Sequence, residues 1–205
     1  MPSPSTASQT KRKRGRPRSF DEIQVLDRSI DVFWQRGYRD VTTRDLEREI
    51  GISQSSIYNA FGSKEGLYSE VVGRYRHRLE TELLPSLEQP TPGVDSLLAF
   101  IDASAEWVGN PARPGCLMLS IDAEQKAAHD HLVDYRARLQ EALRAAVSAF
   151  TTDEDAIARR TTMLEVMTLG LCTAARTNGC DKELQRMVDA ITTQIRIWAD
   201  PGPLL

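Results

Sequence analysis

The chain has 205 residues, of which 40% are hydrophobic and 27% are charged, and its formal net charge is −3. A chain of this length can bury a hydrophobic core without disulfides or a structural metal. Three cysteines are too few for a disulfide scaffold, which indicates a reducing compartment and a cytoplasmic protein. No apolar stretch follows the charged N-terminus and no run approaches ~18 apolar residues, so neither a secretory signal nor a membrane partner is expected.

The basic residues are concentrated at the start of the chain. Residues 1–62 carry 11 Lys and Arg against 8 Asp and Glu, a net charge of +3, whereas residues 63–205 carry 15 against 21, a net charge of −6. Residues 1–10 are small and polar, and six of the eight residues 11–18 are basic. We therefore expect residues 1–18 to be a disordered basic arm that suits a polyanion, in front of an acidic body.

The arm contains the sequence "RGRP" at residues 14–17, which has the shape of an AT-hook core. Proline fixes an extended backbone and glycine permits close approach to the groove floor, so the flanking arginines can enter a narrow A·T-rich minor groove. The candidate DNA-binding arginines of the arm are Arg14, Arg16 and Arg18. The alternative is a solvated tail that keeps the protein soluble.

A first helix is predicted directly after the arm. Ser19 is expected to be its N-cap, with Glu22 three residues later completing a capping box. Apolar residues then recur at spacings of three and four, which predicts one buried face and an end near Gly37.

Two shorter helices follow, and their ends are marked by capping residues. Thr42 is expected to cap the second helix, with Asp45 at its third position, and Gly51 stops it. Ser53 is expected to cap the third helix, which Gly62 terminates. Two short helices joined by a tight glycine-containing turn predict a helix-turn-helix.

The third helix has the side chains needed to read DNA. Its apolar residues must pack inward, which leaves Gln54, Ser55, Tyr58 and Asn59 on other faces. Gln and Asn can bond adenine edges, and a small Ser permits close approach to the groove. The alternative is a helical hairpin with an ordinary polar surface.

The rest of the chain also shows helical periodicity, with no strand-like alternation. Pro90, Pro92 and Gly93 break one long helix, and the segment "GNPARPG" separates two others. The fold class is therefore all-α, with about nine helices. The helices predicted beyond the third are 64–87, 94–108, one starting near Cys116, 128–150, 154–177 and 181–199.

The stretch "TTRDLEREIGISQSSIYNAFGSKEGLY" resembles the DNA-binding domain of TetR-family transcriptional regulators over residues 20–68, and "RGRPRSFDE" resembles arms of that family. The resemblance implies a DNA-binding domain at 19–66 and a ligand-binding and dimerisation domain at 67–205. It also implies that Thr43 and Lys64 contact phosphates and that Tyr58 contacts the DNA backbone. The residues implied to face the groove are Arg44, Gln54, Ser55, Ser56 and Asn59.

A homodimer is also expected. Apolar residues of the last helix recur at spacings of 4, 3, 4 and 3, and two small residues lie four apart in the preceding helix. Two such stripes from each of two chains predict a four-helix interface, although an intramolecular core would give the same pattern. The candidate interface residues are Gly170, Ala174, Leu184, Val188, Ile191, Ile195 and Trp198.

The resemblance further implies an unknown small-molecule effector bound among the body helices. Large apolar and thioether side chains can line an adaptable cavity, although such residues also form ordinary cores. The candidate pocket residues are Phe100, Trp107, Cys116, Met118, Met163 and Met167.

Cys116 lies in "RPGCLML" at a predicted helix start, where the helix N-terminus can lower a thiol pKa. It is a candidate sensor of an electrophile or oxidant, or else a passive packing residue. No catalytic, cofactor or metal-binding constellation is found: His129 and His131 are two residues apart and would point to different sides of a helix.

Several functions are compatible with these features. The leading hypothesis is a ligand-released dimeric repressor on a palindromic operator, and an activator of the same family is a variant of it. An architectural protein that uses its AT-hook-like arm by shape is a second hypothesis. An enzyme using Cys116 with a histidine is a third, which no residue pattern favours.

Overall fold

The structure is a computed structural model that describes residues 20–121, 125–178 and 181–200, and all its regular elements are helices. The α-helices are α1 (Glu22–Asp40), α2 (Thr43–Ile50), α3 (Gln54–Phe61), α4 (Lys64–Glu82), α5 (Val94–Val108), α6 (Lys126–Ser148), α7 (Glu154–Asn178) and α8 (Asp181–Ala199). The predicted all-α class is confirmed, with eight α-helices over the described residues instead of about nine. The helix expected near Cys116 is only a short 3₁₀ helix, η2 (Leu117–Ser120).

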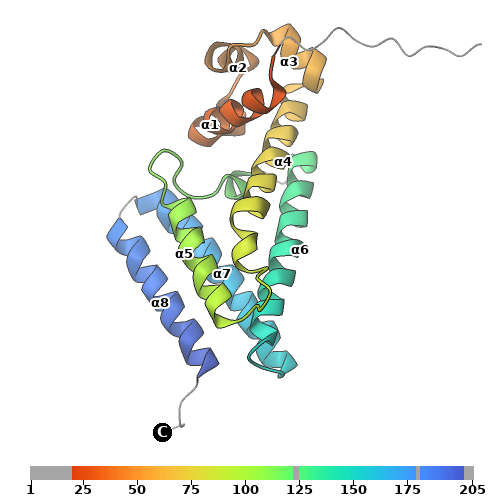
Figure 1. The fold of residues 1–205 in the computed structure, drawn as a ribbon. Helices are drawn as coiled ribbons and strands as arrows, with labels where there is room; N and C mark the ends of the chain where they lie inside the picture. The colour runs from red at the N-terminus through yellow and green to blue at the C-terminus, as the bar shows by residue number, and fades with distance from the viewer. Residues whose placement is uncertain (1–19, 122–124, 179–180, 201–205) are drawn as a thin grey trace, which may run out of the picture.

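Two parts of the molecule are distinct in Figure 1. Residues 20–63, here called the head, contain α1, α2 and α3 at one end. Residues 64–199, here called the body, contain the longer helices α4 to α8. Because α4 begins beside α3 and continues into the bundle, a change in its direction moves the head relative to the body.

The first helix is capped by Asp21, two residues after Ser19, the N-cap predicted from the sequence. Asp21 is the N-cap of α1, and its carboxylate accepts hydrogen bonds from the backbone amides of Ile23 (2.9 Å) and Gln24 (3.3 Å). A carboxylate at this position also interacts favourably with the helix dipole. The predicted cap, Ser19, lies outside the described residues. Gly37 interrupts the helix with φ 75° and ψ 162°, close to the predicted end.

The caps predicted for α2 and α3 are confirmed. Thr42 and Asp45 form a capping box at the start of α2, and Gly51 ends the helix in the left-handed region at φ 83°. Ser53 caps α3 by accepting from the amide of Ser56. Each cap satisfies backbone groups that a helix end otherwise leaves unpaired, so these short helices begin and end where the local chemistry sets them.

The head is joined to α4 through an aromatic core. Ile30, Leu46 and Ile57 are fully buried, one from each head helix. The ring of Phe33 packs edge-on against that of Tyr68 in α4, with centroids 4.9 Å apart. The start of α4 is therefore part of the head's own core.

Helix α4 ends earlier than predicted. The periodicity favoured a helix to Leu87, but α4 ends at Glu82 and is followed by a second 3₁₀ helix, η1 (Leu84–Ser86), with Pro85 in its first turn. Proline lacks an amide hydrogen and disfavours α-helical geometry at the residue before it, which explains the shorter helix.

The body is a helical bundle in which α4 packs against α1 and α6, while α5 packs against α7 and α8. Its interior is apolar, and Phe100 of α5 is fully buried in it. The sequence placed Phe100 in an effector pocket, but it belongs to the core because it faces the neighbouring helices.

The apolar stripe of α8 also belongs to this core. Val188, Ile191 and Ile195 are buried within the single chain, and Ile195 is 0% exposed. The stripe packs inside the bundle, where α5 and α7 adjoin α8, and the assignment of these residues to a dimer interface stays a prediction. Leu184 and Trp198 are half-buried against the same core, and the nearest neighbour of a Cβ at Gly170 is Met187 Cε of α8, at 3.4 Å.

Candidate nucleic-acid interface and effector cavity

The third helix presents a polar surface to solvent. Ser55, Tyr58 and Asn59 are exposed, with Tyr58 51% exposed, and Ile57 is buried on the opposite side. Arg44 at the start of α2 is also exposed. The cap fixes the first turn of α3, because Ser53 Oγ lies 2.9 Å from both Ser55 Oγ and Ser56 Oγ.

Gln54 has a different environment from the one expected of a base-reading residue. Its side-chain oxygen accepts from Thr43 Oγ1 (3.2 Å), and its Nε2 donates to Glu47 Oε2 (2.8 Å). Both partners lie on α2, so Gln54 joins the two helices of the turn. Glu47 was not among the residues predicted from the sequence, although it is a carboxylate of α2 seven residues before Gln54.

Lys64 begins α4 and is half-buried. Its ammonium group lies 4.2 Å from the centroid of the Tyr38 ring, and burial lowers its pKa. Ser63 caps this helix by accepting from the amide of Gly66 (3.0 Å). The stacking holds Lys64 beside a helix N-terminus, a geometry that suits an anion such as phosphate.

Asp45 fixes the start of α2 through several contacts. Its carboxylate accepts from the backbone amide (2.9 Å) and hydroxyl (2.6 Å) of Thr42, and pairs with Arg36 (3.1 Å) and Arg48 (2.9 Å). The hydrogen bonds from Thr42, followed by that from Arg36, hold the pKa of Asp45 well below its usual range. Asp45 therefore remains an anion that restrains two arginines of the head.

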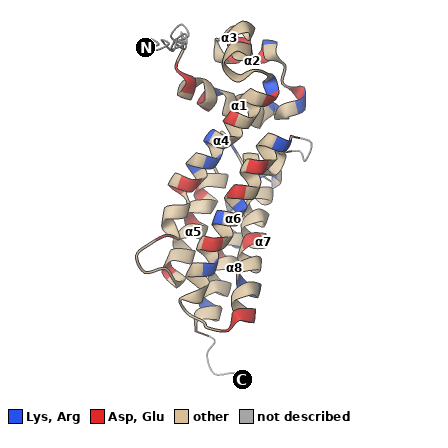
Figure 2. Ribbon diagram, turned by 90° about the vertical axis from the view of Figure 1, so that its right-hand side faces the viewer, with Lys and Arg blue, Asp and Glu red and all other residues tan. Residues whose placement is uncertain are grey.

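The folded head is not basic. Residues 20–63 carry five Lys and Arg against eight Asp and Glu, a net charge of −3, and both signs are visible on the ribbon in Figure 2. The net charge of +3 over residues 1–62 comes from the arm. Arg14, Arg16 and Arg18 lie outside the described residues.

The body contains a cavity of about 350 Å³ with a mostly apolar wall, contributed by α4, α5, η2, α6 and α7. Three of the six predicted pocket residues line it, namely Trp107, Cys116 and Met118. Phe100, Met163 and Met167 do not: Met163 is 42% exposed on α7 and Met167 packs against the core. Tyr135 of α6 and Cys172 of α7 also line the cavity, and neither was predicted as a pocket residue.

A few polar groups interrupt this wall. Ser104 of α5 is buried, and its hydroxyl has no hydrogen-bond partner among the described residues. Arg136, Glu165 and Thr168 lie elsewhere on the wall. A buried hydroxyl without a partner costs free energy, so a ligand atom that bonds Ser104 would be favoured there.

The two cysteines of the wall lie in a hydrogen-bonded cluster. Tyr75 Oη lies 3.7 Å from Cys116 Sγ and accepts from Trp107 Nε1 at 2.9 Å. Cys116 also shares a hydrogen bond with Cys172; this bond is the largest cause of the lowered pKa of Cys116 and of the raised pKa of Cys172. Of the two thiols, Cys116 therefore loses its proton more readily than Cys172.

The loop before Cys116 is attached to the head. Trp34 Nε1 of α1 donates to the carbonyl oxygen of Pro114 (3.2 Å), and Arg113 forms a two-pronged ion pair with Asp31 of α1. We call these two contacts the clip. The clip connects α1 directly to the loop that carries Cys116 into the cavity.

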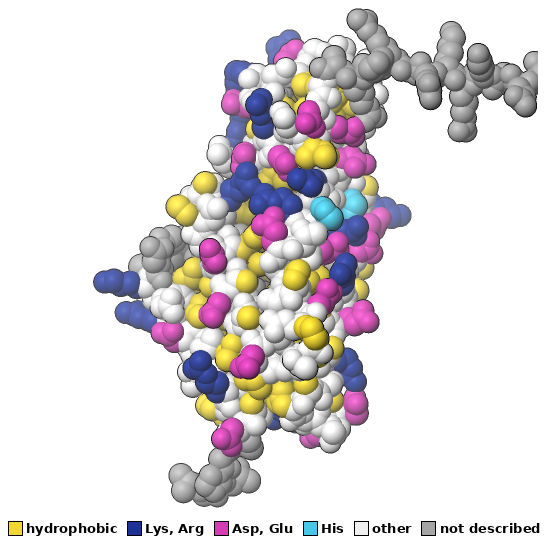
Figure 3. All heavy atoms as spheres, viewed as in Figure 1, with side chains coloured by type: hydrophobic (Ala, Val, Ile, Leu, Met, Phe, Trp, Pro, Cys, Tyr) yellow, Lys and Arg dark blue, Asp and Glu magenta, His cyan; other side chains and the backbone are white. Residues whose placement is uncertain are grey.

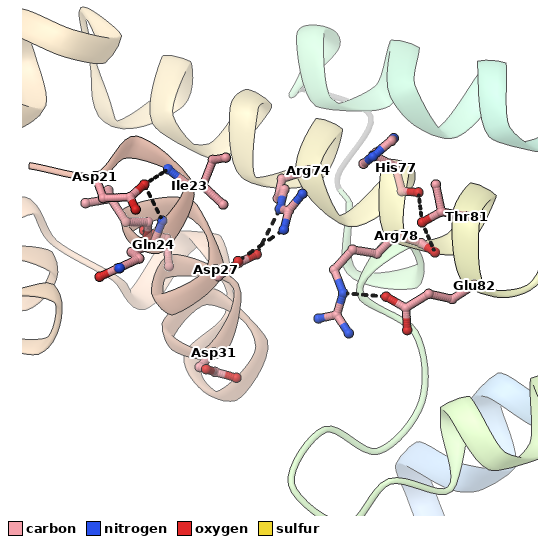
Figure 4. A network of polar contacts seen from close by, with 12 residues as sticks. Asp21, Ile23, Gln24, Asp27, Asp31, Arg74, His77, Arg78, Thr81 and Glu82 are labelled. Atoms are coloured by element: carbon pink, nitrogen blue, oxygen red, sulfur yellow. Dashed lines mark hydrogen bonds and ion pairs between the residues drawn. The ribbon is translucent and has the colours of Figure 1, made fainter.

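A second connection joins α1 to α4. Figure 4 shows Arg74 of α4 directed at Asp27 of α1, with Nε–Oδ1 and Nη2–Oδ2 distances of 2.9 and 3.2 Å. Lys and Arg side chains gather where the head meets the body in Figure 3. The head is thus held from two sides, by α4 and by the loop.

Helices α7 and α8 carry apolar side chains that are exposed in the single chain, and one of them, Val166, also lies on the cavity wall. Val166 is 62% exposed, Met163 lies one turn before it, and Ile197 of α8 is 52% exposed. We call these three residues the outer face. This face was not predicted from the sequence, because the inner stripe of α8 has the more regular apolar spacing.

Among the described residues, no group of three or more His, Cys, Asp or Glu side chains could hold a metal ion. Within the same residues, none of the helices is both long and apolar enough to cross a membrane.

Comparison with known proteins gives consistent matches. The family model "Bacterial regulatory proteins, tetR family" matches residues 25–71. The HTH-type transcriptional repressor BdcR of Escherichia coli is 31% identical over 148 residues, which cover 71% of this chain and 70% of BdcR. The repressor ComR of the same organism is 34% identical over 112 residues, 54% of this chain and 53% of ComR. The chain thus spans about half the length of ComR.

The fold also has solved counterparts. A cysteine mutant of the TetR family regulator CifR, complexed with 26-bp double-strand operator DNA, superposes with a TM-score of 0.75 and 26% identity. The match covers 87% of this chain and 98% of that chain. A TetR-family regulator from Streptomyces coelicolor has the same TM-score at 14% identity and supports the fold alone.

Proposed function

The chain belongs to the TetR family of bacterial regulatory proteins, and from this premise we propose that it is a dimeric transcriptional repressor that binds a palindromic operator and is released by an effector. We assign DNA binding to residues 19–66, and effector binding and dimerisation to residues 67–205. The observation that carries the proposal is the exposed polar face of α3, held at a fixed angle on α2 by caps and by Gln54. The repressors BdcR and ComR support the same regulatory role.

The head residues divide into reading and positioning groups. Asn59 and Ser55 are exposed on α3 and can reach base edges, and Arg44 accompanies them from α2. Tyr58 and Lys64 are suited to phosphates, as are Thr43 and Ser56 beside the helix N-termini. Gln54 acts by orienting α3, because both ends of its amide are occupied by α2.

The arm supplies the positive charge that the head lacks. A head with a net charge of −3 gains little from non-specific attraction to phosphates, whereas residues 11–18 add six positive charges next to it. Phosphate neutralisation dominates non-specific DNA affinity, so the arm brings the head to DNA and α3 selects the sequence. The three arginines, Arg14, Arg16 and Arg18, are proposed to follow the adjacent minor groove.

Dimerisation is proposed to use the outer face of α7 and α8. Met163, Val166 and Ile197 are apolar and exposed in the single chain, whereas the α8 stripe is already buried. Packing two copies of this face would cover these side chains and place two α3 helices on one duplex. A dimer reads two half-sites one helical turn or a multiple of it apart, which accounts for a palindrome.

The effector is proposed to be an apolar molecule with a hydrogen-bonding group that reaches Ser104. The cavity supports this chemistry through its apolar wall and the unpartnered hydroxyl. Occupation would displace the loop at Cys116, and the clip would pass that movement to α1. An effector releases DNA if it binds the released geometry a few kcal/mol better than the DNA-bound one.

Selection of bound duplexes from a random pool tests the proposal. The purified chain is expected to enrich an inverted repeat with a fixed spacing between its halves. Enrichment of A·T-rich duplexes without an inverted repeat would favour an architectural protein. No enrichment over the starting pool at low salt would contradict DNA binding altogether.

A further inference from the structure

Cys116 and Cys172 are brought together by an unusual backbone approach. Gly115 has φ +87°, and a Cβ atom there would lie 2.8 Å from the carbonyl oxygen of Cys172 and 3.0 Å from Cβ of Arg176. Only glycine tolerates both the left-handed conformation and this contact. The loop backbone can therefore lie directly against α7, which places Cys116 beside Cys172.

The two sulfur atoms have complementary surroundings. Tyr75 Oη lies 3.7 Å from Cys116 Sγ and donates its hydrogen to that sulfur. The contact with Cys172, followed by that with Tyr75, lowers the pKa of Cys116, whereas the contact with Cys116 and burial raise the pKa of Cys172. Both sulfurs lie on one cavity wall, and Cys116 is the better nucleophile of the two.

We propose that Cys116 and Cys172 are a redox pair that an apolar organic hydroperoxide oxidises to a disulfide. The class of oxidant follows from the cavity, whose volume of about 350 Å³ and leucine-rich wall favour an organic molecule over a small polar peroxide. The chemistry is independent of the proposed DNA-binding function, which enters only through its consequence, release of DNA.

The reaction balances in two steps. Cys116 thiolate attacks the distal oxygen of ROOH and breaks the O–O bond; the departing alkoxide takes a proton and leaves as ROH, and Cys116 becomes a sulfenic acid. The sulfur of Cys172 then attacks the Cys116 sulfur, forms the S–S bond and expels the hydroxyl group, which takes the Cys172 proton and leaves as water. In total, two thiols and one ROOH give a disulfide, ROH and H2O.

Oxidation moves the loop. An S–S bond is about 2.05 Å long, shorter than a hydrogen-bonded contact between two sulfur atoms, so Cys116 is drawn toward α7. Pro114 and Arg113 precede it and hold α1 through the clip. The disulfide therefore pulls on the head and alters its position relative to α4.

The test uses the full chain with Cys180 replaced by Ser, so that an intramolecular disulfide can join only Cys116 and Cys172. The protein is treated with cumene hydroperoxide or with the same concentration of H2O2, and free thiols, intact mass and non-reduced peptides are followed. We expect both thiols to be lost, a mass decrease of about 2 Da for the two hydrogens removed, and a faster reaction with cumene hydroperoxide.

Two further variants in this background separate the roles of the sulfurs. Cys172→Ser is expected to stop at a Cys116 sulfenic acid that dimedone traps, whereas Cys116→Ser should leave the Cys172 thiol unreacted. Tyr75→Phe keeps the ring and removes the hydroxyl, and should slow the first step.

Three outcomes would overturn the proposal: two intact thiols after treatment, equal or faster reaction with H2O2, or oxidation of Cys172 in the Cys116→Ser variant. DNA binding is measured separately on the reduced protein and on the disulfide form. Failure of the reduced protein to bind any selected duplex would contradict the proposed function without affecting the redox chemistry. A disulfide form that binds DNA as well as the reduced form would contradict the proposed release of DNA by oxidation.

Discussion

The helix pairs α2–α3 and α7–α8 show opposite relations between sequence pattern and exposure. In α2–α3 the apolar residues Leu46 and Ile57 form the only buried side, and the polar side is left for DNA. In α7–α8 there are two apolar sides, and the more regular one, with Ile195, is buried in the chain while the other, with Val166, is exposed. The spacing of apolar residues thus identifies the buried face of a helix that has one apolar side. When there are two apolar sides, spacing alone does not tell which of them is buried.

The largest effect expected from this comparison is loss of the fold when the inner side of α8 is charged. Ile195→Glu places a carboxylate at a fully buried position, at a cost of about 4 kcal/mol for a pKa raised by 3 units. Thermal unfolding followed by circular dichroism should show a much lower midpoint. A wild-type midpoint would mean that Ile195 is not in the core.

Charging the outer face should separate the dimer without unfolding the chain. Val166→Glu together with Ile197→Glu puts two exposed carboxylates where two copies are proposed to meet. Sedimentation should give a dimer mass for wild type and a monomer mass for the variant, with helical circular dichroism retained. A dimeric variant would exclude the outer face as the interface, and a monomeric wild type would exclude the dimer.

Removing the arm tests how far α2–α3 depends on charge from outside the head. Deletion of residues 1–18 removes six basic residues, and each phosphate contact contributes about 0.9 to the salt slope of log affinity. The slope should fall by up to about five, with weaker binding at every salt concentration. An unchanged slope and affinity would identify the arm as a solvated tail.

Substitutions in and beside α3 should distinguish reading from positioning. Asn59→Ala should change the tolerated bases, with a loss of discrimination of about 1–3 kcal/mol. Lys64→Ala, its matched control, should weaken binding to all sequences alike and lower the salt slope by about 1. Base-preference profiles from selected pools check both variants, and an unchanged profile for Asn59→Ala would remove this residue from the reading group.

The smallest expected effect concerns the clip between head and body. Trp34→Phe keeps an aromatic ring but removes the donor to Pro114. DNA affinity without effector should remain close to wild type. The difference in DNA-binding free energy between the reduced and disulfide forms should decrease by about 0.5–2 kcal/mol. An unaltered ratio would mean that the movement reaches the head through α4 and Arg74 instead.

The parts of the molecule that the sequence predicts well are those set by local chemistry. The caps at Thr42 and Ser53 and the bounds of α5 and α8 follow from neighbouring residues. The helix expected at Cys116 fails because the cysteine is extended, at φ −131° and ψ 129°, and a hydrogen bond to Val108 holds Gly115 before it. That contact, like the Cys172 pairing, joins parts of the chain that no local pattern relates.

Pocket residues are harder to predict for the same reason. Phe100, Met163 and Trp107 are all large and lie on helices, yet one is core, one is exposed and one lines the cavity. Which of these outcomes a side chain has depends on the direction of its helix face within the bundle. The residues that were missed, Tyr135 and Cys172, come from helices brought to the cavity only by the tertiary fold.

The central claim is that the outer face of α7–α8 joins two reading heads on one operator. Its most direct measurement compares binding of the wild type and the Val166→Glu, Ile197→Glu variant to duplexes with one or two copies of the selected half-site. Wild type should bind the two-site duplex about 10²-fold or more tightly than the one-site duplex, while the variant should show nearly equal affinities. Equal affinities for wild type, or an undiminished gain in the variant, would contradict the claim.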